Sequence, residues 1–361
     1  MMKVAKNILE RKTFFTPKEE IISLLRGYFA CPIIGFLGKR GFLDRIINKD
    51  FSINEFKKEI PNKELLLEII NYLESIGLVE KIISKGEDRY QTTEIGKKVF
   101  RRYGTFCLLH SYGSFFNQLE KLLFNKKCSE FPNVFRIENI IGSGQVNGRK
   151  YFPAAIEMLK KNRNLSKVID IGCGNGIFLK SVLENFPNCD AVAVDISKVS
   201  LRETKKCLEM NFSNTSLKTI FCNGRDVSTW LPKALNAGAG REEGPLVISM
   251  WYFLHEISKK NIREVIKFFK EIYKLAPFAQ VIVGEIAAIP PEALAKNRHE
   301  SIMPEFLFFH QISGQGVLSL SEYRNMLKKI PYKLKNEKLF DILECCDEKT
   351  PSGFVWHLIP K

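Results

Sequence analysis

Residues 168–195 constrain the fold of this chain more than any other stretch. A short apolar run, 168–171, leads into glycines at 172, 174 and 176, and a second apolar run ends at Asp195. The segment between them has apolar residues at helical spacing: Ile177, Leu179, Val182, Leu183 and Phe186. A short apolar run of this kind is typical of a strand covered on both faces of a parallel sheet. The stretch therefore predicts a strand, a tight glycine turn, a helix and a second parallel strand.

The spacing of the glycines indicates which ligand the turn binds. Glycines let the backbone approach a ligand closely, and the N–H groups that start the following helix favour acceptor or anionic groups. A dinucleotide-binding turn needs a third glycine where Ile177 stands, so pyrophosphate is disfavoured. The carboxylate of Asp170 attracts an ammonium group, and Asp195 is placed to accept from both hydroxyls of a ribose. S-adenosylmethionine carries both of these groups.

These residues resemble a known family. The segment VIDIGCGNG followed by AVAVD is similar to motifs I and II of the class I methyltransferases. The resemblance implies an α/β fold with a Rossmann-like doubly wound sheet and S-adenosylmethionine as cofactor. It also implies that Asp226 accepts from the adenine amino group, although Arg225 splits the family's usual Gly-Asp pair. The residues expected to bind the cofactor are Asp170, Gly172, Cys173, Gly174, Gly176, Asp195, Ile196, Arg225, Asp226, Val227, Met250 and Trp251.

A histidine follows the predicted strand at 245–250. Residues beyond the carboxyl end of such a strand face the ligand crevice. The segment LHEIS resembles the L-H-D-W-S segment of the plant-type small-molecule O-methyltransferases, and the resemblance implies that His255 is the general base. An imidazole suits the task, because a hydroxyl or an enolisable carbon must lose a proton before it attacks a methyl group. Glu256 either orients its neighbours or caps the helix.

A second histidine leaves the type of acceptor open. The strand at 280–286 opens into an insertion, 287–320, which has Ser313-Gly314-Gln315-Gly316 where the family has a G-G-K-E-R segment. His310 within the insertion, together with His255, resembles the paired histidines of the α-keto acid C-methyltransferases. That resemblance implies a divalent or ferric metal ion on both imidazoles, whereas an O-methyltransferase needs none. The acceptor is expected to be a small molecule in either case.

The segment 51–100 predicts a winged helix. A helix over 51–60 with Ser52 as its N-cap, a second helix ending at Gly77 and two strands around a turn at 85–87 follow one another. The segment DRYQTTEIGKKV resembles the wing of the dimerisation domain of the plant-type O-methyltransferases. The alternative is a nucleic-acid-binding regulator with a methyltransferase-like core. That reading needs a basic recognition helix, but the second helix carries Glu64, Glu68 and Glu74.

The domain boundaries are expected near residues 103 and 165. Residues 1–103 form a helical and winged-helix dimerisation domain, 104–165 linker helices that line the substrate pocket around a polar loop at 142–145, and 166–361 the catalytic domain. Residues 18–47 read as helical, interrupted at Pro32, and too apolar for one small domain to cover. A homodimer is expected, with an interface formed by Tyr28, Phe29, Ile33, Ile34 and Phe36.

Composition and charge bear on whether the protein is secreted, membrane-bound or active on nucleic acid. The start of the chain lacks the apolar core of a signal peptide and the apolar runs are too short to cross a bilayer, so a cytoplasmic protein is expected. The net charge of +15 reflects a lysine-rich composition, and no N-P-P-Y-like tetrad of a nucleic-acid methyltransferase follows the strand at 245–250. Cys345-Cys346 is expected to be a reduced pair.

Overall fold

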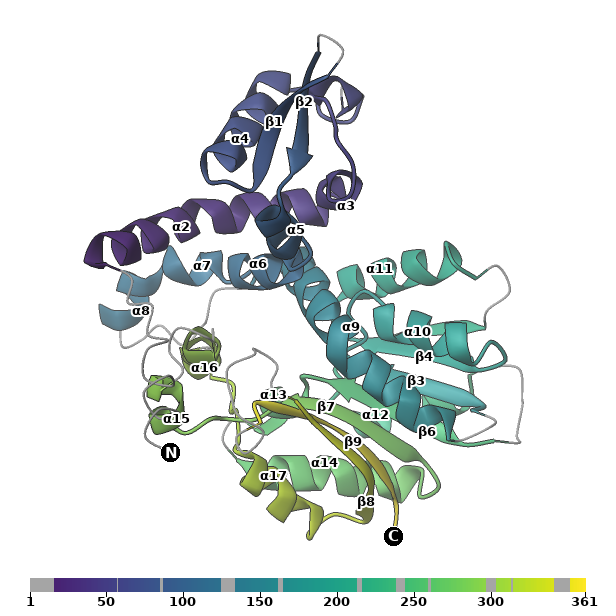
Figure 1. Cartoon of the computed structure of the whole chain (residues 1–361). Coiled ribbons are helices and arrows are strands. Elements are labelled where there is room, and N and C mark those ends of the chain that lie inside the picture. The colour runs from purple at the N-terminus through teal and green to yellow at the C-terminus, as the bar shows by residue number, and fades with distance from the viewer. Residues whose placement is uncertain are drawn as a thin grey trace, which may run out of the picture. The chain divides into compact units, whose positions relative to one another are not determined.

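The computed structural model describes residues 16–56, 58–84, 87–124, 134–161, 165–212, 216–237, 244–258, 261–296, 303–312, 314–340 and 351–361. They divide into two compact units, Met1–Ser111 and Tyr112–Lys361 (Figure 1). The predicted linker at 104–165 is shared between the two units. Ser313, Cys345, Cys346 and most of the turn at 85–87 lie outside the described residues.

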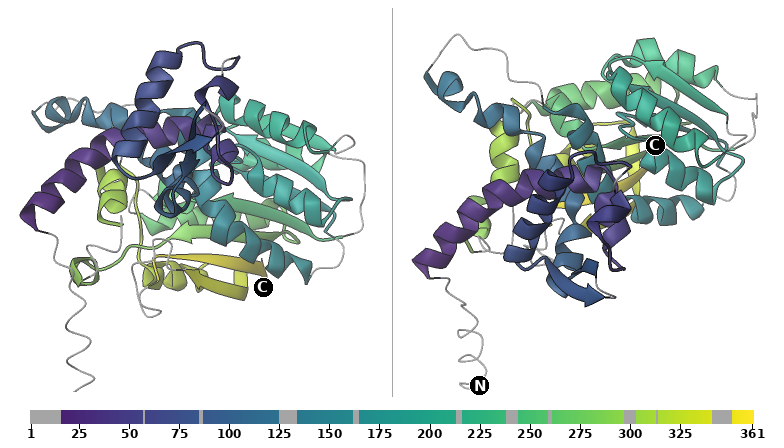
Figure 2. Two further views of the ribbon diagram at one scale, coloured as in Figure 1. Left: turned by 45° about the horizontal axis from the view of Figure 1, so that its top comes forward. Right: turned by 90° about the horizontal axis from the view of Figure 1, so that it is seen from above.

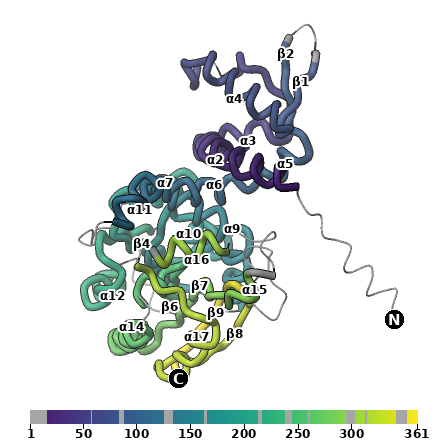
Figure 3. The backbone as a smooth tube through the Cα atoms, turned by 90° about the vertical axis from the view of Figure 1, so that its left-hand side faces the viewer, coloured from purple at the N-terminus to yellow at the C-terminus, as the bar shows by residue number. Residues whose placement is uncertain are grey.

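The first unit contains the predicted winged helix. Helix α4 (Lys63–Ser75) is followed by the antiparallel strands β1 (Val79–Ser84) and β2 (Glu87–Thr92), which lie beside it in Figure 3. The side chain of Asn62 caps α4 by accepting from the N–H of Leu65 at 2.9 Å. Gly77 follows the helix at φ 77°, a left-handed conformation that glycine adopts without strain. The winged-helix prediction is confirmed.

The prediction of a helix over 51–60 is wrong in its extent. Only a single 3₁₀ turn, η1 (Ile53–Phe56), forms there. Phe51 pairs with Tyr90 of β2 in an isolated bridge, so the chain is still extended where the helix was expected to begin. The Ser52 N–H donates to the Glu55 carboxylate at 3.1 Å, and the Ser52 side chain is not a cap. The remaining helices of this unit are α2 (Pro17–Lys39), α3 (Phe42–Ile46), α5 (Glu94–Phe100) and α6 (Tyr103–His110).

Helix α2 runs without a break through Pro32, contrary to the predicted interruption. A capping box formed by Thr16 and Glu19 satisfies its first turn. Ile34 is 1% exposed and belongs to the core of this unit, so it cannot contribute to an interface as expected. By length and composition α2 could also cross a membrane, which corrects the estimate made from the apolar runs; the core helix of a soluble protein meets the same test.

The second unit is built on a seven-stranded sheet with the order β5-β4-β3-β6-β7-β9-β8. Its strands are β3 (Lys167–Ile171), β4 (Asp190–Asp195), β5 (Leu217–Phe221), β6 (Leu246–Trp251), β7 (Gln280–Ile286), β8 (Tyr332–Phe340) and β9 (Gly353–Pro360). The first five run parallel, whereas β9 is antiparallel to both β7 and β8. The predicted Rossmann-like doubly wound sheet is confirmed, with the two closing strands at one edge.

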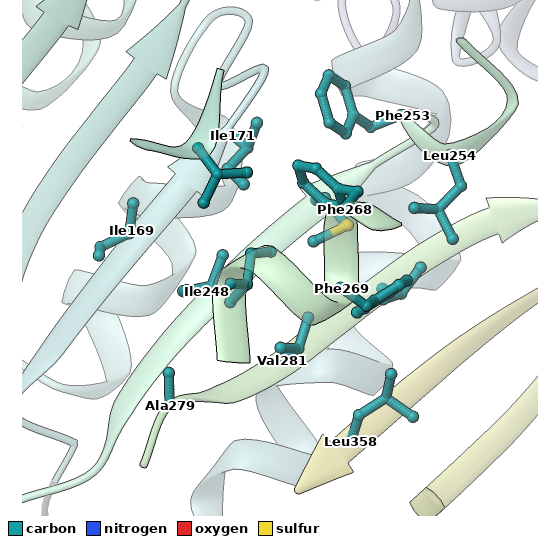
Figure 4. Packing of buried hydrophobic residues seen from close by; sticks show 14 of the residues in the cluster. Ile169, Ile171, Ile248, Phe253, Leu254, Phe268, Phe269, Ala279, Val281 and Leu358 are labelled. Atoms are coloured by element: carbon teal, nitrogen blue, oxygen red, sulfur yellow. The ribbon is translucent and has the colours of Figure 1, made fainter. Parts of the chain in front are cut away.

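Helices cover both faces of this sheet (Figure 2). One face packs on α9 (Arg136–Lys160), α10 (Ile177–Asn185) and α11 (Lys198–Glu209). The opposite face packs on α12 (Val227–Leu235), α14 (Ile262–Leu275) and α17 (Leu320–Leu327). Figure 4 shows part of this second layer, in which Ile169 and Ile248 of the strands belong to the same cluster as Phe268 and Phe269 of α14. Alternate residues of β3 thus enter opposite layers, as a strand buried on both faces requires.

The polar loop expected at 142–145 lies inside helix α9. Gly142 and Gly144 are buried there, and a Cβ on Gly144 would stand 2.7 Å from the Asn175 side chain in the glycine turn. Gly144 therefore marks a close approach of α9 to the Asn175 side chain, and neither glycine breaks the helix. The other helices of this unit among the described residues are α7 (Gly113–Phe116), α8 (Leu119–Phe124), α13 (Leu254–Ser258), α15 (Pro291–Lys296) and α16 (Met303–Ile312).

Candidate active site

The predicted cofactor residues gather where the parallel strands end. The glycine turn after β3 holds Gly172, Gly174 and Gly176 at φ 68°, 58° and 76°, which explains why glycine stands at each position. A Cβ on Gly176 would lie 2.9 Å from the side chain of Thr204 on α11. The Thr204 hydroxyl in turn donates to the carbonyl oxygen of Gly174 at 3.1 Å. The turn is thus fixed from the side of α11.

Asp195 at the end of β4 is held in one orientation. Its carboxylate accepts from the N–H of Gly174 at 3.2 Å and from the N–H of Ser197 at 2.7 Å. The guanidinium of Arg136, at the start of α9, lies 3.3 Å from the same carboxylate. Asp195 is 2% exposed, so these contacts keep a buried charge paired beside the glycine turn.

Asp170 is buried in β3 and only half of its carboxylate is satisfied. The hydroxyl of Ser249 on β6 donates to Oδ1 at 2.7 Å, whereas Oδ2 has no hydrogen-bond partner of normal geometry among the described residues. Burial raises the pKa of Asp170 to about 7, against the lowering effect of the Ser249 hydroxyl. The indole N–H of buried Trp251 faces Asp170 and also lowers this pKa, although no hydrogen bond of normal geometry joins the two side chains. A buried acceptor beside the turn that is only partly satisfied fits the ammonium of an amino acid.

The residues expected around the adenine differ in exposure. Ile196 is 60% exposed next to Asp195, and Asp226 is exposed at the start of α12 with a side chain that does not cap the helix. Val227 and Met250 are fully buried in the hydrophobic core, so their side chains serve packing. Arg225 donates a hydrogen bond to the carbonyl oxygen of Glu256 and so links the β5–α12 loop to α13.

His255 forms a buried pair with Glu285, the penultimate residue of β7. Their Nδ1 and Oε1 atoms are 2.8 Å apart, and both side chains are nearly inaccessible. The Glu285 carboxylate also accepts from the N–H groups of Leu254 at 2.7 Å, His255 at 3.2 Å and Ile286 at 2.8 Å. Together with the imidazole, this carboxylate therefore has four hydrogen-bond partners. Because it occupies Nδ1 of His255, the opposite nitrogen, Nε2, is the one that can accept a proton.

The charge of Glu285 decides the basicity of His255. Burial lowers the pKa of the imidazole, but the Glu285 carboxylate, through its charge and its hydrogen bond, outweighs burial. Glu256 adds to the effect, and the pKa of His255 ends above its ordinary value. Burial also raises the pKa of Glu256, which faces His255, Arg136 and Arg225. The arrangement gives a buried imidazole whose protonated form is stabilised by an adjacent carboxylate.

The structure brings the two predicted histidines together. The rings of His255 and His310 are 4.7 Å apart, edge to face. Nδ1 of His310 lies 2.6 Å from the carbonyl oxygen of Phe306, so Nδ1 carries the proton and Nε2 the lone pair. Burial and the neighbouring His255 lower the pKa of His310 to about 3, which keeps it neutral. Within the part of the chain that the structure describes, no group of three or more His, Cys, Asp or Glu side chains is arranged to hold a metal ion.

Aromatic side chains of the predicted linker lie beside helix α16. Tyr112 stacks on Phe309 with ring centroids 4.3 Å apart, and Phe116 meets Phe309 edge to face at 5.5 Å. His310 is the next residue of α16 and packs on Phe306 at 4.1 Å. An apolar wall therefore adjoins the histidine pair.

Three residues of the site are not predicted from the sequence: Arg136, Ser249 and Glu285. Glu285 could have been found, because it stands at the carboxyl end of a parallel strand, where side chains face the crevice. Ser249 and Arg136 act through side chains distant in sequence, Asp170 and Asp195 respectively, and no local pattern marks such contacts.

Solved structures with the same architecture support this description of the fold. A protein from Nostoc punctiforme to which O-methyltransferase activity is ascribed is 12% identical, with a TM-score of 0.60 over 95% of this chain and 100% of that one. Mitomycin 7-O-methyltransferase MmcR is 13% identical, with a TM-score of 0.52 over 95% and 98%. LepI, solved with S-adenosylhomocysteine and a substrate analogue, is 10% identical, with a TM-score of 0.53 over 100% and 94%. Identities this low show the fold alone.

One curated relative matches part of the chain. The secondary metabolism regulator laeA of Coprinopsis cinerea is 37% identical over 87 residues, which are 24% of this chain and 21% of the fungal protein. The chain thus matches about a fifth of the length of this relative.

Two family models match the chain itself. The AprA winged helix domain matches residues 26–126, and the methyltransferase domain matches residues 145–341, more than half of the chain. Together with the glycine turn, the ordered acidic residues and the parallel sheet, these matches establish that the chain belongs to the methyltransferases, with an AprA-type winged-helix domain at its N-terminal side.

Proposed function

We propose that this methyltransferase uses S-adenosylmethionine to methylate a small molecule, and that His255 removes the proton from the acceptor. The acceptor atom is a hydroxyl oxygen or the enolisable carbon of an α-keto acid. The observation that carries the proposal is the buried pair of His255 and Glu285 at 2.8 Å, placed where strands β6 and β7 end. A carboxylate at this position stabilises the protonated imidazole, so the histidine can accept a proton during a reaction.

The residues around the glycine turn fit the cofactor. Asp195 presents a fixed carboxylate for the ribose, and Asp170 offers an acceptor for the ammonium of the amino acid end. Ile196 and Asp226 are exposed on the side where the adenine is expected. When bound, the cofactor supplies an electrophilic methyl group on a sulfonium.

His255 takes the proton of the acceptor onto its Nε2 atom. Glu285 keeps the Nδ1–H in place and balances the positive charge that the imidazole acquires. The backbone N–H groups of Leu254 and His255 fix that carboxylate, so it cannot turn away. The neutral His310 lies edge-on to His255. In the metal-dependent branch both imidazoles would hold the metal ion, and the metal would then take the place of the proton transfer at Nε2 of His255.

The proposal is tested by incubating the full chain with labelled S-adenosylmethionine and panels of phenols, hydroxy acids and α-keto acids, each with and without a chelator. Transfer of label to one class identifies the acceptor atom. Loss of transfer with the chelator, restored by added metal, selects the metal-dependent branch. Failure to bind or consume the cofactor under all conditions would refute the proposal. The exposed acidic residues Glu64 and Glu68 on α4 give the nucleic-acid alternative no support.

Replacing Asp195 with alanine is expected to weaken cofactor binding. The ribose hydroxyls lose a charged acceptor, and hydrogen bonds to charged groups contribute about 1.5–3 kcal/mol, or roughly 10–150-fold in affinity. Titration calorimetry with S-adenosylhomocysteine measures the change. A thermal unfolding curve controls for damage to the turn, because Asp195 also accepts from Gly174 and Ser197. Unchanged affinity would remove Asp195 from the site.

A homodimer is also proposed, and it is expected to form through helix α2. Leu24, Leu25, Tyr28 and Phe29 are 60–78% exposed on this helix, an apolar surface too large for a lone domain to leave in water. Sedimentation of the full chain at micromolar concentration is expected to give a dimer, and Leu24→Glu with Tyr28→Glu a monomer. Lys18→Glu, on the same helix, is the control for charge. A monomeric wild-type chain would contradict the proposal.

A further inference from the structure

One face of helix α9 crosses the ends of the parallel strands. A Cβ on Gly144 would stand 2.7 Å from the Asn175 side chain in the turn after β3, and the Tyr151 ring lies 3.0 Å from the position of a Cβ on Gly284 of β7. Asn147 stands three residues after Gly144 and four before Tyr151, so all three share one face of the helix. In the sheet β6 lies between β3 and β7. Asn147 is therefore placed at the carboxyl end of β6.

The side-chain amide of Asn147 is buried without a complete set of partners. Asn147 is 3% exposed, and its Oδ1 atom is buried and has no hydrogen-bond partner among the residues that the structure describes. Buried polar atoms of native proteins are nearly always hydrogen-bonded, because an unpaired acceptor destabilises the fold. Packing alone would be served better by an apolar side chain of the same size. The amide therefore indicates a partner that does not belong to the chain itself.

Asp170 provides a second buried acceptor on the same side of the sheet. Both neighbours of Asp170 along β3 belong to the cluster under α12 and α14, so the Asp170 side chain points to the side that α9 covers. Trp251, at the end of β6, lies on this side too: its indole N–H faces Asp170, and its ring packs on Phe152 of α9 with ring centroids 4.7 Å apart. Oδ2 of Asp170 and Oδ1 of Asn147 are thus two acceptors without a partner of normal geometry, in one layer at the ends of β3 and β6.

We infer that Asn147 binds the amino acid end of S-adenosylmethionine, and that its Oδ1 atom accepts a hydrogen bond from the ammonium group that Asp170 also attracts. The inference rests on the proposed function and adds to it a binding residue on α9. An ammonium group carries three N–H donors, so the one free oxygen of Asp170 cannot satisfy it. Because both unpaired atoms are acceptors, they favour a cation over a carboxylate or a phosphate.

A binding role and a packing role of Asn147 have opposite consequences for the Asn147→Leu variant. Leucine is of similar size and removes the unpaired acceptor, so the ligand-free variant should unfold at the same temperature as the wild type or at a higher one. The bound cofactor, in contrast, loses a hydrogen-bond acceptor. If Asn147 served packing only, stability and affinity would fall together or neither would change.

The experiment compares S-adenosylhomocysteine with its deamino analogue, which lacks only the ammonium group, by titration calorimetry of the full chain. The wild type is expected to prefer S-adenosylhomocysteine. Asn147→Leu and Asn147→Ala should each weaken this ligand by about 10–150-fold, the range for losing a hydrogen bond to a charged group, and should affect the analogue much less. Asn336→Leu is the matched control, because Oδ1 of Asn336 is also buried without a partner among the described residues but lies in β8 at the sheet edge. It should keep both affinities.

Three results would overturn the inference and leave the proposed function standing. One is unchanged affinity for S-adenosylhomocysteine in both Asn147 variants. Another is an equal loss for both ligands with a lowered unfolding temperature, which would make the effect structural. The third needs no variant: a wild type that binds both ligands equally well has no site for the ammonium group. A wild type that binds neither ligand would instead count against the proposed function itself, and the inference would fall with it.

Discussion

The His255→Ala variant is expected to lose about 10²–10⁴ of its turnover and to bind S-adenosylmethionine as tightly as the wild type. The imidazole acts on the acceptor, and its contacts are with Glu285 and His310 and not with the glycine turn. The loss should therefore appear in kcat under saturating cofactor, measured by transfer of a labelled methyl group. Calorimetry with S-adenosylhomocysteine measures the affinity.

A second buried histidine provides the control for this variant. His357 on β9 lies 2.6 Å from the Gln280 side chain through Nε2 and joins β9 to β7. His357→Gln should keep near wild-type turnover. Activity retained in His255→Ala would overturn the catalytic assignment altogether.

The His310→Ala variant distinguishes a metal-dependent reaction from one in which no metal takes part. If both imidazoles hold a metal ion, either alanine variant should lose metal content and activity together, and metal analysis of the purified proteins reads this out directly. If no metal takes part, activity should be insensitive to chelators and should suffer mainly from the loss of His255. His310 is neutral in either case, because burial and His255 lower its pKa to about 3.

Local patterns predict the catalytic unit well and the N-terminal helices less well. The strand at 280–286 and the glycine turn are found as predicted, since alternation and glycine spacing are local properties. The chain passes helically through Pro32 and through Gly144, where local rules predict a break or a loop. Packing decides these cases: Gly144 is needed for the approach of α9 to Asn175, a contact that no window of sequence contains.

In the candidate site, too, local patterns predict some residues, whereas packing decides others. His255 and Asp195 follow from motif and position, because Asp195 ends the parallel strand β4 and His255 follows the parallel strand β6. The pairing of His255 with Glu285, and the approach of His310 to His255, depend on how α13, β7 and α16 pack in space.

Replacing Glu285 with glutamine should lower turnover by about 10²–10⁴-fold, the scale known for removing the carboxylate that orients a catalytic histidine. An amide cannot accept from all four donors that now surround this carboxylate, and it cannot balance an imidazolium. Glu285→Asp keeps the charge and should recover part of the loss. Equal damage in both variants, with a lowered unfolding temperature, would indicate a structural role only.

The pH profile of the Glu285→Gln variant gives a sharper test than its rate. A general base must be neutral, so activity falls as the pH drops through the pKa of His255. In the wild type the Glu285 carboxylate outweighs burial and raises that pKa, which moves the acid limb of the kcat profile to higher pH. In the glutamine variant burial acts without this opposition and the pKa falls, so the acid limb should move to lower pH although the maximal rate is smaller. Because loss of packing alone lowers the rate without moving the limb in this direction, an unmoved limb would show that Glu285 does not tune His255.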